Sequence, residues 1–235
     1  MSEQVGIALV GATGLIGRAI IGESVGRADF RLLALARREV KLPKGATVDV
    51  MVADPAGWGD VIGKFRPQVL ISALGTTIVK MGGDKAAFRA VDYDLVVDTA
   101  QAAFDHGVER CVVVSSVNAN PQAKMFYPQV KGEAEQALMK LGFKRLDLLR
   151  PGLLRGARED DPRALEKAAM IVSPLTDLLM HGSFRSMRSI AAIDVARAAL
   201  ALAHRKAAGK FRHEHDAMKL AAGEFPRLEA RSGDS

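Results

Sequence analysis

The chain has 235 residues and a formal net charge of +6, and its basic residues are scattered rather than gathered in one block. Nearly half of the residues are apolar, which is enough to bury a sizeable core. Because Cys111 is the single cysteine, an internal disulfide and a cysteine-based zinc site are excluded. The scattered charge and the low aromatic content argue against a nucleic-acid partner.

Strands and helices alternate along residues 5–149. Apolar runs predict strands at 5–10, 30–36, 47–52, 69–73, 111–115 and 146–149, and helical spacing predicts helices at 16–25, 85–105 and 126–141. Crossovers of this kind join parallel strands, and uninterrupted apolar strands indicate a sheet that is covered on both faces. The sequence therefore predicts an α/β fold with a doubly wound parallel sheet in three layers, a Rossmann fold.

The C-terminal third has a weaker pattern. No shift in composition divides the chain, so we expect one domain over residues 1–235. Residues 164–180 are expected to be helical, and residues 190–204 to form a strand end followed by an alanine-rich helix. Residues 151–225 are expected to contribute a small substrate cap beside the sheet, and residues 226–235 a frayed tail. The polar run His213-Glu214-His215 is interpreted as a solvated turn and not as a metal site, because no further ligands stand at metal spacing.

The sequence shows no sign of a membrane span or of a secretory signal. Every apolar run is shorter than the roughly 18 residues that a membrane-spanning helix needs, so no membrane association is expected. Residues 1–10 lack the basic start and the small-residue cleavage site of a secretory signal peptide. Together with the single cysteine, these features predict a cytoplasmic protein.

A glycine-rich loop, G-x-x-G-x-x-G, directly follows the first predicted strand and opens the first helix. Glycines at these places allow a tight turn, close approach of a pyrophosphate, and close packing of helix on strand, while the helix N-terminus attracts phosphate. The alternative is an ordinary glycine turn in an α/β protein. We expect a nicotinamide dinucleotide to bind at Gly11, Thr13, Gly14, Leu15, Ile16 and Gly17.

The ends of the next strands bear on the choice of cofactor. Arg37 and Arg38 follow the second strand, where guanidinium groups suit a 2′-phosphate, so NADP is favoured over NAD. Asp54 follows the third strand, where its carboxylate can accept from the adenine amino group or simply cap the helix behind Pro55. A loop of small residues after the fourth strand lets the backbone pass the adenosine ribose; it comprises Ala73, Leu74 and Gly75.

Tyr127 and Lys131 stand four residues apart at the start of a predicted helix, so they share one face. A nearby ammonium favours the phenolate form, and such a tyrosine can exchange a proton with a carbonyl or alcohol oxygen. The same lysine can hold the nicotinamide ribose. Ser115 and Ser116 end the fifth strand, where a hydroxyl can hydrogen-bond to the substrate oxygen. The alternative for the pair is a surface aromatic and a solvated helix charge.

Together these motifs resemble the short-chain dehydrogenase/reductase superfamily over residues 5–205. Segments 73–77, 88–94, 114–116, 127–135 and 149–154 are similar to the atypical reductases related to the human Tat-interacting protein. Two departures stand out. Val117 occupies the place of a third hydroxyl residue, and Asp92 and Asp94 occupy the neighbourhood where many extended members carry an asparagine.

The resemblance implies an NADP(H)-binding Rossmann fold with a Ser-Tyr-Lys site, and a homodimer. It assigns Ser116, or else Ser115, to polarise the carbonyl, Tyr127 to act as acid and base, and Lys131 to tune it. Pro151 and Leu153 would flank the nicotinamide.

Three functions follow from these features. The first is an NADP(H)-dependent oxidoreductase that moves a hydride to or from a small carbonyl or alcohol. The second is an NADP(H)-binding redox sensor that acts through a protein partner, since the fold alone does not prove turnover. The third is an isomerase or dehydratase that keeps a tightly held cofactor.

Overall fold

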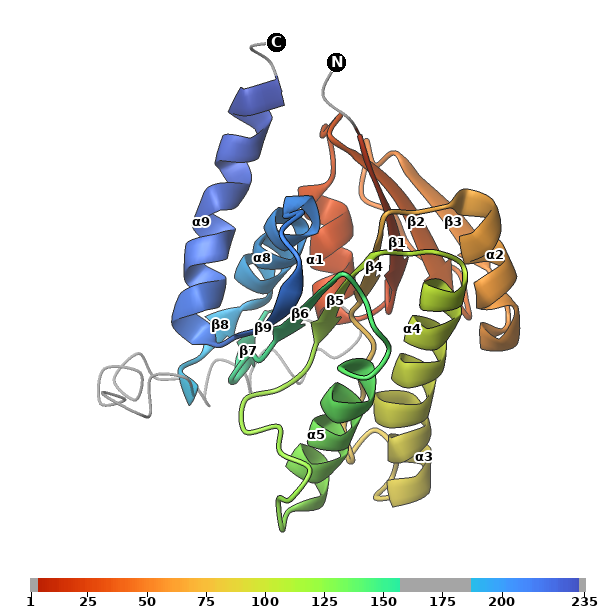
Figure 1. Ribbon diagram of the computed structural model, residues 1–235, viewed down its shortest axis with the longest axis vertical. Coiled ribbons are helices and arrows are strands. Elements are labelled where there is room, and N and C mark those ends of the chain that lie inside the picture. Colours follow the sequence, from red (N-terminus) through yellow and green to blue (C-terminus); the bar gives the residue numbers. More distant parts are fainter. Residues whose placement is uncertain (1–3, 157–186, 233–235) are drawn as a thin grey trace.

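The computed structural model describes residues 4–156 and 187–232, and of residues 226–232 the backbone only. A seven-stranded sheet forms the centre, in the order β3-β2-β1-β4-β5-β6-β9, and each pair of neighbours is parallel (Figure 1). This confirms the predicted doubly wound α/β fold. The strands are β1 (Val5–Val10), β2 (Phe30–Ala36), β3 (Val48–Val52), β4 (Val69–Ser72), β5 (Arg110–Val114), β6 (Arg145–Leu149) and β9 (Gly209–His213).

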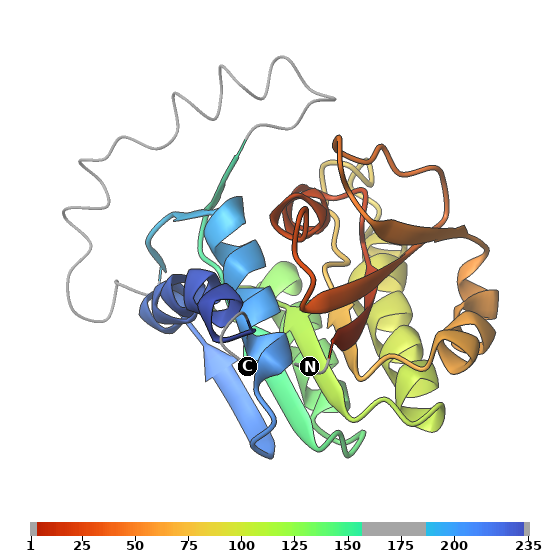
Figure 2. The ribbon, with the colours of Figure 1, turned by 90° about the horizontal axis from the view of Figure 1, so that it is seen from above.

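Helices cover both faces of this sheet, so β1, β4, β5 and β6 are buried along their whole length. Figure 2 shows α1 and α8 on one side of the strands and α4 on the other. Strand runs without polar alternation are the sequence signature of such two-sided burial. The helices are α1 (Leu15–Glu23), α2 (Trp58–Phe65) with the short turn η1 (Pro55–Gly57), α3 (Lys85–Arg89), η2 (Ala90–Asp94), α4 (Leu95–Asp105), α5 (Phe126–Leu138), α8 (Ala192–His204) and α9 (His215–Ser232).

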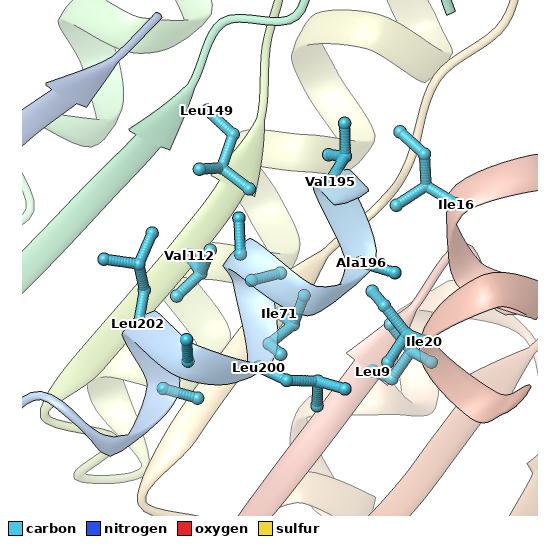
Figure 3. Close-up of a cluster of buried hydrophobic side chains, with 14 of the residues drawn as sticks. Leu9, Ile16, Ile20, Ile71, Val112, Leu149, Val195, Ala196, Leu200 and Leu202 are labelled. Carbon is cyan, nitrogen blue, oxygen red and sulfur yellow. The ribbon is translucent and has the colours of Figure 1, made fainter. Parts of the chain in front are cut away.

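Helix α8 lies on the same face of the sheet as α1 and packs against it. Its residues 198–203 are all buried. The helix packs against the sheet and α1 (Figure 3), and α9 also contacts it. A stretch of helix that is apolar on every side is expected in such a place. Leu200 and Val195 reach toward the sheet and α1, and the alanines between them allow close packing.

A charged cluster joins the start of β2 to the end of α8. Asp29 accepts hydrogen bonds from Arg27 at 2.9 and 2.7 Å and contacts His204 at 3.1 Å, and the Arg27 guanidinium lies 4.3 Å from the Phe225 ring centre. Burial by itself would raise the pKa of Asp29. The hydrogen bonds from Arg27 and His204 outweigh it, so the pKa of this carboxyl is held well below its ordinary value.

The predicted helix over residues 85–105 is interrupted. α3 and α4 are joined by η2, a π-helical segment over Ala90–Asp94, so one extra residue is accommodated in the turn. The prediction of one regular helix was therefore wrong in the middle. Asp92, a polar residue within this segment, is buried at 1% exposure, where a regular amphipathic pattern would place an apolar side chain.

The C-terminal segment differs most from expectation. Residues 226–232 continue helix α9 and are not a frayed tail. The expected turn at residues 213–215 is instead the junction of β9 and α9. His213 is the last residue of β9, is buried, and contacts Asp147 at 2.8 Å. Pairing with β6 supplies the backbone hydrogen bonds that make this polar segment a strand.

Part of the range expected to form the substrate cap, residues 151–225, belongs to the main three-layer body. α8 packs against the sheet in the hydrophobic core, and β9 extends the sheet. Among the described residues of this range, β7 (Leu154–Arg155) and β8 (Ile190–Ala191) form a separate two-stranded pair. The predicted helix at 164–180 lies outside the described residues. Among the described helices, none has the length and apolar character needed to cross a bilayer.

Candidate functional site

The glycine loop connects β1 to α1 at the carboxyl end of the sheet. Gly11 has φ +84°, and a Cβ there would lie 2.4 Å from the Ala73 carbonyl oxygen. A Cβ on Gly17 would lie 2.2 Å from the Gly11 carbonyl oxygen, so helix and loop pack as closely as backbones allow. These two positions therefore require glycine.

The N-terminus of α1 is left open for a ligand. Gly14 is the N-cap residue, no side chain caps this end, and the first turn carries no acidic residue. The first N–H groups of a helix have no partner within the helix, and the helix dipole is positive there. Thr13 is half-buried beside this end, and its carbonyl accepts a 3.1 Å hydrogen bond from Arg18. The geometry suits a phosphate group.

The ends of the neighbouring strands carry the other residues that the sequence predicts to contact a cofactor. Arg37 and Arg38 directly follow β2 and are exposed, so both guanidinium groups are accessible. Asp54 accepts a 3.0 Å hydrogen bond from the Ala56 N–H and caps η1, which is one of its two predicted roles. The contact of Asp54 with adenine stays a prediction. Ala73 pairs its N–H with the Val10 carbonyl at 2.9 Å, which brings the loop after β4 against the glycine loop.

Tyr127 is the second residue of α5, and Pro128 lies in the first turn as predicted. The Tyr127 side chain is 40% exposed, and its ring centre lies 5.6 Å from that of the buried Phe88 ring. The tyrosine is thus fixed on one side and open on the other, as a proton-exchanging group must be.

Lys131 lies one turn further along α5 and is almost fully buried. Its Nζ is 2.7 Å from Asp92 Oδ1, with the two side chains only 7% and 0% exposed. The pair is an ion pair whose angle falls outside a regular hydrogen bond. The other oxygen, Asp92 Oδ2, accepts a 2.8 Å hydrogen bond from the Thr76 N–H. The sequence singled out Lys131 but assigned Asp92 no role in the site.

The two serines after β5 have different surroundings. Ser115 is buried, and its Oγ has no hydrogen-bond partner among the described residues. It borders a cavity of about 10 Å³ that Asp92, Lys131 and Glu135 also line, roughly the space of one water molecule. Ser116 is half-buried, with its Oγ 3.2 Å from the Val117 carbonyl. The difference in access favours Ser116 as the serine that meets a substrate.

An ion pair between Glu135 and Arg150, which the sequence did not predict, joins α5 to the end of β6. Glu135 accepts from Arg150 Nε at 2.9 Å and also from Arg150 Nη2, which donates at 3.1 Å to the Ala119 carbonyl. Glu135 follows Lys131 by one helical turn, and this spacing was the available signal. Arg150 precedes Pro151, whose carbonyl accepts from Val117 at 2.9 Å.

The residues expected beside the nicotinamide come directly after Arg150 in the chain. Pro151 is buried and Leu153 is 49% exposed, just before β7. A Cβ on Gly152 would lie 2.6 Å from the Arg188 carbonyl oxygen, so the segment passes close to the start of β8. Within residues 4–156 and 187–232 no group of three His, Cys, Asp or Glu side chains could hold a metal ion.

The fold is similar to solved structures of nucleotide-binding enzymes. A putative NAD-dependent epimerase/dehydratase from Bacillus halodurans gives a TM-score of 0.65 at 22% identity, over 94% of this chain and 99% of that one. MoeE5 in complex with UDP-glucose and NAD gives a TM-score of 0.66 at 16% identity, over 96% and 82%. At these identities the likeness supports the Rossmann-like fold.

A curated relative corrects one expectation. The protein FMP52, mitochondrial, of Saccharomyces cerevisiae is 35% identical over 159 residues, which are 66% of this chain and 68% of the relative. This relative is named mitochondrial, as are the other FMP52 proteins that match. The cytoplasmic expectation is thereby contradicted. A test for a secretory signal peptide cannot detect mitochondrial targeting, because import uses a different signal.

The family model that matches this chain is HIM1, over residues 66–184. The match runs from the segment before β4 through the loop after β4, η2, β5, α5 and β6. It therefore includes the predicted site residues Ser116, Tyr127 and Lys131, and Asp92, which pairs with Lys131. With half of the sequence matched by the model and curated relatives at comparable coverage, this chain belongs to the HIM1 family.

Proposed function

We propose that this protein is an NADP(H)-dependent oxidoreductase of the short-chain dehydrogenase/reductase type, acting on a small carbonyl or alcohol. The observation that carries the proposal is the glycine loop, where Cβ atoms at Gly11 and Gly17 would collide with backbone while the uncapped N-terminus of α1 stays open. A loop packed this closely beside an open helix end suits a pyrophosphate.

The residues present suit a bound dinucleotide along its whole length. The N-terminus of α1 would hold the phosphates, and Arg37 and Arg38 would hold a 2′-phosphate by bidentate hydrogen bonds. The loop after β4 would pass the riboses. Pro151 and Leu153 would flank the nicotinamide from the end of β6. NAD is the alternative cofactor, and it is the one bound in MoeE5.

When bound, the dinucleotide would supply or accept the hydride of such a reaction. In reduction Tyr127 donates its phenolic proton to the carbonyl oxygen, so one hydride and one proton convert the carbonyl to an alcohol. In oxidation the phenolate takes the proton back. Ser116 donates a hydrogen bond to the same oxygen and shares its developing charge. Lys131 stabilises the phenolate and donates to the ribose hydroxyls.

The chain contains two tyrosines, which provides a matched pair of variants for testing this chemistry. Tyr127→Phe removes the hydroxyl of the accessible tyrosine, and Tyr93→Phe removes that of a tyrosine whose ring packs 4.3 Å from the Arg89 guanidinium. Loss of NADPH absorbance is followed with a panel of small aldehydes, ketones and quinones. We expect Tyr127→Phe to lose about 100-fold or more in kcat while it still binds NADPH, and Tyr93→Phe to behave as wild type.

Two outcomes would count against the mechanism. Wild-type turnover that survives Tyr127→Phe would remove the acid/base role. Absence of turnover across the whole panel, in a protein that binds NADPH, would argue against a reductase.

A second candidate is favoured by the likeness to epimerase and dehydratase structures. In this version the chain keeps its dinucleotide between turnovers and acts as an isomerase or dehydratase, on a substrate such as a nucleotide sugar. Nucleotide that remains bound through purification and is released only on denaturation would support this candidate. Purified protein without nucleotide would contradict it.

Two narrower points belong to the same proposal. The resemblance to the Tat-interacting reductases implies the Ser-Tyr-Lys site on which this mechanism rests. The names of the FMP52 relatives lead us to propose a mitochondrial location. Cell fractionation with an antibody to this chain tests it, and recovery outside mitochondria would contradict it.

A further inference from the structure

One buried carboxylate, that of Asp92, joins three segments that are distant in sequence. Its Oδ2 accepts from the Thr76 N–H at 2.8 Å in the loop after β4, and its Oδ1 lies 2.7 Å from Lys131 Nζ on α5. Asp92 itself lies on the π-helical segment η2. The carboxylate is therefore the common contact of the three segments that meet here.

Burying such a pair is costly. Taking an aspartate and a lysine out of water costs several kcal/mol for each ion, and an apolar pair of similar volume is often at least as stable. Stability alone therefore gives a poor account of an ion pair whose side chains are 0% and 7% exposed. π-Helical turns are frequently found at functional sites, and Asp92 is the buried residue of this one.

The pair lies directly beneath the loop that the proposed cofactor passes. A Cβ on Gly75 would lie 3.5 Å from Asp92 Oδ1 and 3.7 Å from Lys131 Nζ. The opposite charges of Asp92 Oδ1 and Lys131 Nζ, 2.7 Å apart, hold the ammonium at this place beneath the loop. Asp92 thereby fixes the position of the ammonium and that of the Thr76 backbone at the same time.

We propose that Asp92 is a positioning residue, which holds the Lys131 ammonium and the Thr76 backbone in the arrangement that receives the ribose of the dinucleotide. The inference rests on the proposed function, since it names how that site is held together. It divides the carboxylate into two roles: the Oδ1 contact orients the lysine and the Oδ2 contact orients the loop.

Four variants separate the two roles through the dissociation constant of NADPH, measured by nicotinamide fluorescence. Asp92→Asn keeps an acceptor for the Thr76 N–H but removes the charge that faces Lys131. Asp92→Ala removes both contacts. Lys131→Met removes the ammonium, and it is studied alone and together with Asp92→Asn. Asp94→Asn, at an exposed position in the same π-helical segment, is the control.

We expect Asp92→Asn and Lys131→Met each to weaken NADPH binding about tenfold, and the double variant to weaken it by about the same factor as either single variant. Two substitutions that disable one unit are not additive, whereas general destabilisation would multiply their effects. Asp92→Ala should bind a further about tenfold more weakly than Asp92→Asn, because the loop contact is also lost. Asp94→Asn should match the wild type. Thermal unfolding confirms that each variant is folded at the assay temperature.

The outcomes distinguish this inference from the proposed function. Wild-type protein that fails to bind NADPH would overturn both. Wild-type protein that binds, with Asp92→Asn binding equally well or with a hundredfold loss in the double variant, would overturn the inference and leave the proposed function standing. Asp92→Asn is the decisive variant if Asp92→Ala does not fold.

Discussion

Replacing Gly17 by alanine tests the close packing of the glycine loop. The new Cβ would lie 2.2 Å from the Gly11 carbonyl oxygen and 2.7 Å from the Ala12 Cα, distances that backbone atoms cannot accommodate without moving. Gly22 is the matched control, because it lies in the same helix and a Cβ there meets nothing within 4 Å. Both substitutions gain about 1 kcal/mol of helix propensity, so the difference between them measures the clash alone.

The clash should cost about 1–3 kcal/mol, the usual range for overpacking. Gly22→Ala should therefore raise the free energy of unfolding by up to about 1 kcal/mol, and Gly17→Ala should lower it relative to that control by about 3 kcal/mol, since both clashing atoms are backbone. Displacing the loop by even a fraction of an ångström should also weaken NADPH binding at least about tenfold. Urea unfolding and fluorescence titration measure the two effects. Equal stability and equal affinity in the two variants would refute the packing reasoning.

Two further predictions concern the fold. Leu200→Ala, at the buried centre of α8, should lower the free energy of unfolding by about 2–5 kcal/mol. Leu220→Ala, at a position 69% exposed on α9, should change it by less than about 0.5 kcal/mol. Similar losses in both variants would contradict the buried position of α8. Asp29→Asn should cost about 2 kcal/mol at neutral pH. Because the folded pKa of Asp29 is depressed below its ordinary 3.8, that contribution is present above about pH 4 and is lost as the pH falls further, so wild type and variant should converge in acid; a constant difference down to pH 2 would contradict this account.

The central sheet was predictable because its strands are buried on both faces. Runs such as Val5–Val10 and Phe30–Ala36 contain almost no polar residue, and their boundaries in the structure agree with the sequence. The glycine loop was predictable from its position, because a loop that joins the first apolar strand to the first helix has a recurrent geometry in this fold.

The C-terminal elements were not predictable from local pattern. β9 has the sequence Gly-Lys-Phe-Arg-His over Gly209–His213, in which three consecutive residues are exposed, and it becomes a strand because it pairs with β6 at the edge of the sheet. The buried His213 is stabilised by Asp147, a residue 66 positions away. A contact of such sequence separation leaves no periodic signal.

The candidate site was predictable in its residue types but not in its partnerships. The spacing of Tyr127 and Lys131 singled out both residues, and the serine pair was found at the expected strand end. The role of Asp92 was missed, because helical spacing can place it on a buried face but does not reveal that its carboxylate meets Lys131 and the Thr76 N–H. The clamp of Glu135 on Arg150 was missed because its members come from α5 and the end of β6.

Titration of the purified protein with NADPH and with NADH tests the central claim most directly. The account predicts that wild-type protein binds NADPH at least about tenfold more tightly than NADH, and that replacing Arg37 and Arg38 together by serine abolishes this preference by weakening NADPH alone. Equal affinity for both nucleotides in wild type and variant would contradict the assignment to NADP. Binding of neither nucleotide would contradict the oxidoreductase, because the glycine loop would then be a structural turn only.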